Sequence, residues 1–114
     1  MSDCLFCDIV KKKVKANFIF ESKELLAFED IRPQAPIHIL IIPKKHIPTL
    51  NDLKEEDKAM MGELFLTAKE IARAQGISAT GYRTVFNCNH DSGQAVYHLH
   101  LHLLGGRRMS WPPG

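Results

Sequence analysis

The sequence has little of what marks membrane-spanning or nucleic-acid-binding proteins. Its formal net charge is only +2, and no apolar run approaches the roughly 20 residues that span a bilayer. The lysines of its one basic run have no aromatic residues between them for base stacking and indicate a solvated helix end: Lys11, Lys12, Lys13 and Lys15. We therefore expect neither nucleic acid nor a membrane as a partner.

Cysteine is also scarce. Three cysteines, of which Cys4 and Cys7 lie only three positions apart, form a poor disulfide framework and favour a reducing compartment with a metal clip. Cys88 lies in a predicted strand and is expected to pack there. The first residues, Met1-Ser2-Asp3-Cys4, lack the basic start and apolar core of a secretory signal. We therefore expect a cytoplasmic protein.

The 114 residues, 45% of them hydrophobic, suit one domain with a modest core, which we place at residues 1–114. Residue alternation and β-forming residues predict strands at 17–21, 25–29, 37–42, 82–88 and 97–104. From about Asp52 to Gly76 the apolar residues recur with helical spacing instead. The sequence predicts an α+β fold in which one long helix covers an antiparallel sheet.

Three histidines stand at alternate positions of the last predicted strand: His98, His100 and His102. Alternate side chains of a strand share a face at a spacing of about 6.6 Å, while the intervening leucines face the other way. This spacing suits a phosphate-sized group held between ring nitrogens. An imidazole with a pKa near 6.5 can serve as a neutral nucleophile or base, or as a charged donor. A metal site or a polar edge strand is the alternative.

With its surroundings, this histidine pattern resembles the histidine-triad nucleotide-binding family, called HIT, and most closely its Hint branch. The likeness covers nearly the whole chain, through Phe28 to Ile31, Pro33 to Pro36, Ile42 to His46, Gly93-Gln94, His98 to Leu104, Gly105-Gly106 and the ending Ser110 to Gly114. It implies a HIT-like five-stranded antiparallel sheet with one long helix and a short N-terminal helix. It also implies a homodimer with a ten-stranded sheet, with the C-terminal tail 105–114 at the interface; a floppy tail is the alternative.

The resemblance implies a hydrolase or transferase that cleaves purine nucleoside 5'-phosphoramidates or acyl-nucleotides at the α-phosphorus and releases AMP or GMP. His100 matches the nucleophile, which forms a covalent nucleotidyl-histidine intermediate, and the main-chain carbonyl of His98 orients its ring. His102 and His38 match ligands of the phosphate oxygens. The chemistry itself requires no cofactor.

Other matching residues are implied to bind the substrate. Asp30 matches the carboxylate that accepts from both ribose hydroxyls, and Asn87 and Gln94 match contacts to the phosphate or the departing group. The apolar slot for the base is matched by Leu5, Phe6, Ile9, Phe28, Ile31 and Leu40, and Trp111 of the tail joins the substrate-binding set. Ala95 departs from the Hint pattern, which usually carries a serine that assists the leaving amine. This loss predicts slower phosphoramidate turnover, at a cost of about 1 to 3 kcal/mol if the site is left unpaired, and a smaller penalty for acyl leaving groups.

Cys4 and Cys7 form a Cys-x-x-Cys pair, which needs two further ligands to close a tetrahedral zinc site. In zinc-bearing HIT relatives the partners match His46 and His98, so a structural zinc is the predicted cofactor. A redox pair and a metal-free pair of buried thiols are the competing interpretations.

Two other functions compete with histidine-based catalysis. The triad could hold a catalytic metal, although positions six to seven ångströms apart do not easily converge on an ion with bonds of about 2 Å. The other competitor is a nucleotide-binding or protein-interaction module with vestigial catalysis, which the missing serine favours.

Overall fold

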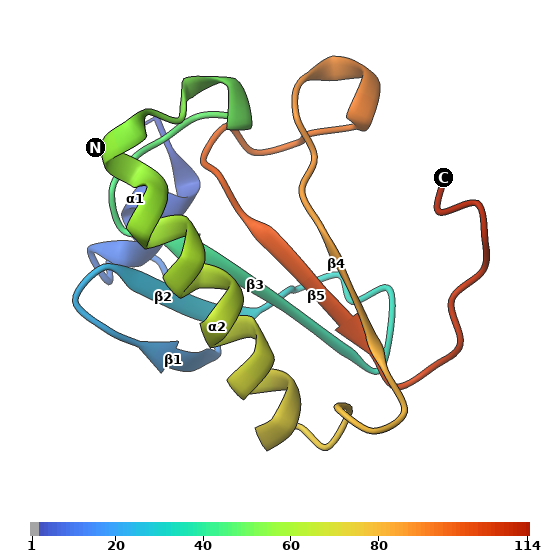
Figure 1. The fold of residues 1–114 in the computed structure, drawn as a ribbon. Coiled ribbons are helices and arrows are strands. Elements are labelled where there is room, and N and C mark those ends of the chain that lie inside the picture. The colour runs from blue at the N-terminus through green and yellow to red at the C-terminus, as the bar shows by residue number, and fades with distance from the viewer. Residues whose placement is uncertain (1–2) are drawn as a thin grey trace.

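The structure, a computed structural model, describes residues 3–114. Its elements are, in chain order, α1 (Leu5–Val10), β1 (Phe18–Glu21), β2 (Leu25–Glu29), β3 (Ile37–Pro43), the 3-10 turns η1 (Leu50–Asp52) and η2 (Glu55–Asp57), α2 (Lys58–Ala74), β4 (Tyr82–Val85), the 3-10 turn η3 (His90–Ser92) and β5 (Leu101–Gly105). The strands form one antiparallel sheet in the order β1-β2-β3-β5-β4, with α2 across it (Figure 1). The predicted α+β fold, with a long helix and a short N-terminal one, is confirmed.

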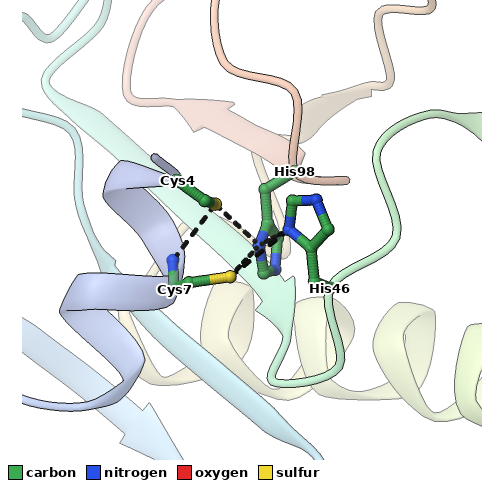
Figure 2. Close-up of side chains that lie close together, drawn as sticks. All are labelled: Cys4, Cys7, His46 and His98. Atoms are coloured by element: carbon green, nitrogen blue, oxygen red, sulfur yellow. Dashed lines mark hydrogen bonds between the residues drawn. The ribbon is translucent and has the colours of Figure 1, made fainter. Parts of the chain in front are cut away.

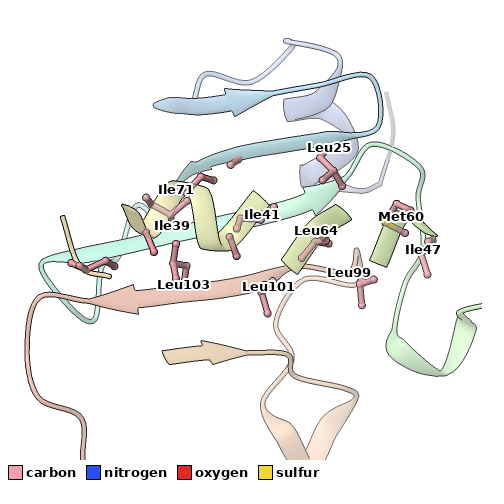
Figure 3. Packing of buried hydrophobic residues seen from close by; sticks show 14 residues of the cluster. Leu25, Ile39, Ile41, Ile47, Met60, Leu64, Ile71, Leu99, Leu101 and Leu103 are labelled. Atoms are coloured by element: carbon pink, nitrogen blue, oxygen red, sulfur yellow. The ribbon is translucent and has the colours of Figure 1, made fainter. Parts of the chain in front are cut away.

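Both faces of the central strand β3 are covered. Ile39 and Ile41 are buried in the core that the sheet forms with α2 (Figure 3). Leu40 and Ile42 belong to a second cluster on the opposite face, where Phe6 of α1 packs against them. Because alternate strand residues point to opposite faces, a strand buried on both sides must be apolar almost throughout, as residues 37–42 are.

The same alternation places the histidines on the α1 side of the sheet. Leu101 and Leu103 of β5 lie in the core beneath α2, so His102 between them points to the other face. His38 of β3 likewise precedes Ile39, which faces α2. His38 and His102 thus share the α1 side of the sheet with the second apolar cluster.

The last strand is shorter than predicted, since the ladder begins at Leu101 rather than at residue 97. In the β3–β5 register, in which His38 lies opposite Leu104, Leu99 would lie opposite Pro43. Proline has no N–H to give to a ladder. Leu99 instead donates its N–H to the carbonyl of Ile47 at 2.7 Å. The first two histidines of the triad therefore lie on the segment that leads into β5.

The long helix begins at Lys58, six residues after the predicted start. Aspartate side chains close two short turns before it: Asp52 accepts from the N–H of Thr49 at 3.0 Å, and Asp57 accepts from that of Lys54 at 2.8 Å. Such local side-chain bonds compete with helix formation. Strand β4 is also shorter than predicted and ends at residue 85. Within residues 3–114 no helix has the length and apolar character to cross a membrane.

Candidate active site and metal centre

Both ring nitrogens of His98 make a hydrogen bond, and together these bonds fix the orientation of the ring. Its Nε2 lies 2.7 Å from the carbonyl oxygen of Pro43, and because a carbonyl only accepts, Nε2 carries the proton. The lone pair is then on Nδ1, which faces Cys4 Sγ at 3.3 Å. Burial, with repulsion from His46 and His100, lowers the pKa of His98 to about 4, against the effect of the Pro43 bond. His98 is therefore neutral, and a main-chain carbonyl orients its ring so that the Nδ1 lone pair could serve a metal ion.

Four donor atoms converge where α1 meets this ring (Figure 2). Cys7 Sγ lies 3.3 Å from His46 Nδ1 and 3.5 Å from His98 Nδ1, and the two ring nitrogens are 3.2 Å apart. Zinc bonds of about 2.0 to 2.3 Å place tetrahedral corners about 3.3 to 3.8 Å apart. The predicted set of Cys4, Cys7, His46 and His98 is thus brought together with separations that suit a zinc ion.

The cysteines also define the start of α1. Cys4 is the N-cap residue of the helix, and its Sγ accepts from the N–H of Cys7 at 3.2 Å. A ligand bound by both sulfurs would therefore fix the first turn of a helix that has only six residues. The same turn carries Phe6, whose buried ring lies edge-on to that of His100, 5.1 Å between centroids.

His100 has a reactive nitrogen directed away from the main chain. Its Nδ1 lies 2.7 Å from the carbonyl oxygen of His98, so Nδ1 carries the proton and Nε2 keeps its lone pair. Burial lowers the pKa of His100, while the His98 bond and the negative charge of Asp30 oppose that shift. The ring is accordingly neutral near pH 7, with its nucleophilic nitrogen unprotonated.

His102 is paired with His38 of the neighbouring strand. The main-chain N–H of Gln34 donates to His38 Nδ1 at 3.0 Å, which leaves the proton of neutral His38 on Nε2. That nitrogen lies 2.9 Å from His102 Nδ1 and 3.4 Å from a carboxylate oxygen of Asp30. Since His102 Nδ1 accepts this proton, the proton of neutral His102 is on Nε2. Burial, with repulsion from His100 and His38, lowers its pKa to about 4 against the charge of Asp30.

A cavity of about 380 Å³ opens beside the last two histidines. Most of the predicted site residues line it, and these are Leu5, Phe6, Ile9, Phe28, Asp30, Ile31, Leu40, Asn87, His100 and His102. Much of the lining is apolar, and it also includes the carboxylate of Asp30 and the imidazoles of His100 and His102. It can therefore hold a flat apolar group together with a polar, phosphate-sized one.

Four of the predicted catalytic and substrate-binding residues are not among those that line the cavity. His38 is 6% exposed and meets His102 from behind, while His98 is directed to the cysteines. Gln94 is buried with its amide used inside the loop, accepting from the N–H of Asn89 at 2.8 Å and donating to main-chain carbonyls. The fourth, Trp111, is 82% exposed in the tail.

Two cations at the cavity were not predicted. Lys15, interpreted from sequence as part of a solvated run, lines the cavity, as does Arg32. Nothing in the local pattern distinguishes Lys15 from the lysines before it. Only the position of the loop after α1, which returns beside β2, brings it to the site.

The geometry does not favour a single metal held by the whole triad. Among residues 3–114, the side chains grouped closely enough for an ion form two separate sets, one with His98 and the other with Asp30, His38 and His102. His100 is in neither set. In the second set, the bond from Gln34 keeps a proton on His38 Nε2, the nitrogen that faces the other two residues. The side chains of the triad therefore lie in two places: His98 is in the cysteine cluster, and His100 and His102 are at the cavity.

Comparisons with known proteins establish the family of the chain and its fold. The family model of the HIT domain matches residues 11–109. An uncharacterized HIT-like protein of Synechococcus elongatus is 48% identical over 112 residues, which are 98% of this chain and 97% of that protein. The crystal structure of a HIT family hydrolase from Legionella pneumophila is similar with a TM-score of 0.97 at 56% identity, over 98% of this chain and 100% of that one. A histidine triad protein from Clostridium difficile gives a TM-score of 0.93 at 36% identity, over 96% of both chains. The chain belongs to the HIT domain family.

Proposed function

We propose that this protein is a nucleotide hydrolase or transferase of the Hint branch, which cleaves purine nucleoside 5'-phosphoramidates or acyl-nucleotides and releases AMP or GMP. The observation that carries the proposal is the 2.7 Å contact of His100 Nδ1 with the His98 carbonyl, which leaves Nε2 unprotonated at the cavity. The similar Legionella pneumophila protein is itself named a hydrolase. The ending Ser110 to Gly114 favours the Hint branch.

In the proposed first step, His100 Nε2 attacks the α-phosphorus. A bond forms between nitrogen and phosphorus, the bond to the amine or acyl oxygen breaks, and the leaving group departs with its electron pair. A departing amine also takes up a proton from solvent, which the attacking water returns in the second step. The imidazolium that results keeps its Nδ1 proton on the His98 carbonyl, which stabilises the positive charge. Water then attacks phosphorus, the Nε2–P bond breaks, and the nucleoside monophosphate is released.

His102 and His38 supply the polarity that the phosphorus centre needs. The Nε2–H of His102 is available to a nonbridging oxygen because its Nδ1 is occupied by His38 at 2.9 Å. A fixed donor in a water-poor site is most effective where negative charge develops in the transition state. His38 acts through His102, from a position behind the cavity.

The nucleoside would occupy the rest of the cavity. The Phe6 and Phe28 rings, 5.4 Å apart, form its apolar wall, and stacking area favours a purine over a pyrimidine. Asp30 is at the cavity with one carboxylate oxygen already accepting from the N–H of Arg32 at 2.8 Å. The remaining acceptor capacity of this carboxylate suits ribose hydroxyls.

Ala95 lines the same cavity and has no hydroxyl to offer a departing amine. We expect acyl leaving groups to be favoured over amines for this reason. Changing Ala95 to serine should raise turnover of phosphoramidates more than that of acyl-nucleotides. An unchanged ratio of the two rates would contradict the role given to this position.

We also propose a structural zinc ion held by Cys4, Cys7, His46 and His98, whose four donor atoms fit a tetrahedral site. When bound, the ion supplies a crosslink between α1 and the segment before β5 and takes no part in the reaction. It would stabilise the wall of the cavity that α1 carries.

A homodimer is the proposed assembly, with the tail at the interface. Trp111 is 82% exposed and Leu66 of α2 is 60% exposed. Exposed apolar surface of this kind is typical of a protein–protein interface. Sedimentation equilibrium should give twice the chain mass, and a monomer at micromolar concentration would contradict the proposal.

The catalytic proposal is tested by turnover of adenosine 5'-phosphoramidate and of an acyl adenylate. Replacing His100 with alanine should reduce both rates by at least about a thousandfold, since loss of a nucleophile removes the covalent route. Changing His90 to alanine is the matched control, because its side chain is fully exposed on η3 and outside the cavity lining. Binding of AMP without turnover above the His100→Ala level would instead support a binding module.

A further inference from the structure

The C-terminal tail contacts the loop between β2 and β3 through one guanidinium group. Arg107 Nε donates to the main-chain carbonyl of Gln34 at 3.0 Å, and its Nη1 donates to the carbonyl of Arg108 at 3.1 Å. The bond to the Arg108 carbonyl holds the guanidinium against the tail itself. The bond to the Gln34 carbonyl therefore links the tail to the loop. The loop is otherwise largely exposed at this point, and Gln34 itself is exposed.

The residue before Arg107 approaches the same loop. A Cβ built on Gly106, whose φ is +89°, would lie 2.9 Å from Pro36 Cβ. Only glycine adopts this conformation readily and leaves room for the proline. The chain after β5 is therefore placed against the loop by backbone conformation, and the Arg107 bond fixes the position.

Gln34 connects this contact to the histidines through its main chain. Its carbonyl accepts from Arg107, and its N–H donates to His38 Nδ1 at 3.0 Å. This N–H is the group that keeps the His38 proton on Nε2, from which it reaches His102 Nδ1 at 2.9 Å. The side-chain amide of Gln34 donates elsewhere, to the carbonyl of Arg32 at 3.0 Å.

We propose that Arg107 is a positioning residue, which holds Gln34 so that its N–H sets the tautomer of His38 and thereby presents the Nε2–H of His102 to the substrate. The catalytic consequence rests on the proposed function; the effect on the His38 tautomer does not. Without the bond from Arg107 to the Gln34 carbonyl, His38 can carry its proton on Nδ1. His102 must then donate from its own Nδ1 to the unprotonated Nε2 of His38. A lone pair would replace the donor that faces the phosphate oxygens.

Imidazole nitrogen NMR on ¹⁵N-histidine protein tests the tautomer directly, because protonated and unprotonated ring nitrogens have well separated shifts. In the wild type, His38 should show Nδ1 unprotonated and Nε2 protonated. In Arg107→Gln, the two His38 shifts should move toward each other as the tautomers mix, and Arg107→Lys should restore them in part. Unchanged His38 shifts in Arg107→Gln would overturn the proposal.

Arg83→Gln is the matched control for loosening of the tail. Arg83 Nη2 donates to the carbonyl of Ser110 at 3.0 Å, so it also anchors the tail by a guanidinium bond but does not contact Gln34. Its removal should leave the His38 shifts as in the wild type. A change equal to that of Arg107→Gln would mean that any loosening of the tail suffices, which would also overturn the proposal.

Kinetics of the same variants separate positioning from binding. Arg107→Gln should lower kcat by about three- to tenfold, the range expected for one lost hydrogen bond, with KM changed less. A fall in affinity with kcat retained would contradict the assigned role. If the wild type turns over none of the nucleotide substrates, the proposed function fails while the NMR result still decides the role of Arg107.

Discussion

Replacing Phe6 with alanine tests whether one aromatic ring holds α1 and the proposed nucleophile, His100, in place. Phe6 is 5% exposed, and its ring lies edge-on to those of Phe28, His100 and His98 at centroid distances of 5.4, 5.1 and 6.0 Å. Truncating a buried phenylalanine costs about 3 to 5 kcal/mol. Helix α1 has only six residues and can detach from the sheet, which limits the loss of stability. We therefore expect the free energy of unfolding to fall by about 3 kcal/mol, at the lower end of this range.

Urea unfolding followed by circular dichroism measures this loss, and calorimetric titration with AMP measures its effect on the cavity. Affinity for AMP should fall together with stability, since the same ring lines the site. Leu5→Ala is the matched control for stability alone, since Leu5 also lines the cavity. Leu5 is 46% exposed, so its truncation should cost less than about 1 kcal/mol. A Phe6→Ala variant that loses less than about 1 kcal/mol and binds AMP normally would refute the reasoning.

Three further predictions follow from the packing, the cysteine cluster and the buried imidazoles. Gly105→Ala would place a Cβ 2.5 Å from Ile77 Cδ1; we expect a loss of about 1 to 3 kcal/mol in urea unfolding, partly recovered by Ile77→Ala. Metal analysis should find one zinc per chain, and Cys7→Ser should lose the zinc and lower the melting temperature; equal zinc content in both would contradict the site. His102 has a pKa of about 4 in the folded protein, against about 6.5 in the unfolded chain, so the unfolded state binds more protons between these pH values. The free energy of unfolding should therefore rise with pH across that window. His102→Gln should reduce this rise, and an unchanged slope would contradict the assigned burial of the ring.

The sequence sufficed to predict the sheet, the covering helix and the face on which the triad lies. Alternation of leucine and histidine determines which side chains reach the core under α2, and the structure has Leu99, Leu101 and Leu103 there. The four-residue metal set, carried by the resemblance, is also brought together. In both cases the information is local in sequence or contained in a specific motif.

Long-range contacts account for what could not be predicted. The ladder of β5 begins at Leu101 because Pro43, which would lie opposite Leu99 on the neighbouring strand, has no N–H to offer. The sequence around either residue does not show that the two would lie opposite each other. Gln94 is turned away from the cavity because its amide donates to the carbonyl of Val96 nearby and to that of Pro48, which is 46 positions away in the sequence. The contact of Arg107 with the loop before β3 joins residues 73 positions apart, which no local pattern predicts.

The most direct test of the account is to trap the intermediate on His100. Adenosine phosphoramidate labelled at the α-phosphorus is mixed with the protein and quenched rapidly in alkali, and peptides are then examined by mass spectrometry. We expect an adenylyl group on the peptide that carries His100, stable in alkali, lost in acid and absent from His100→Ala. Rapid turnover in the wild type with no label on protein, or undiminished turnover in His100→Ala, would contradict it.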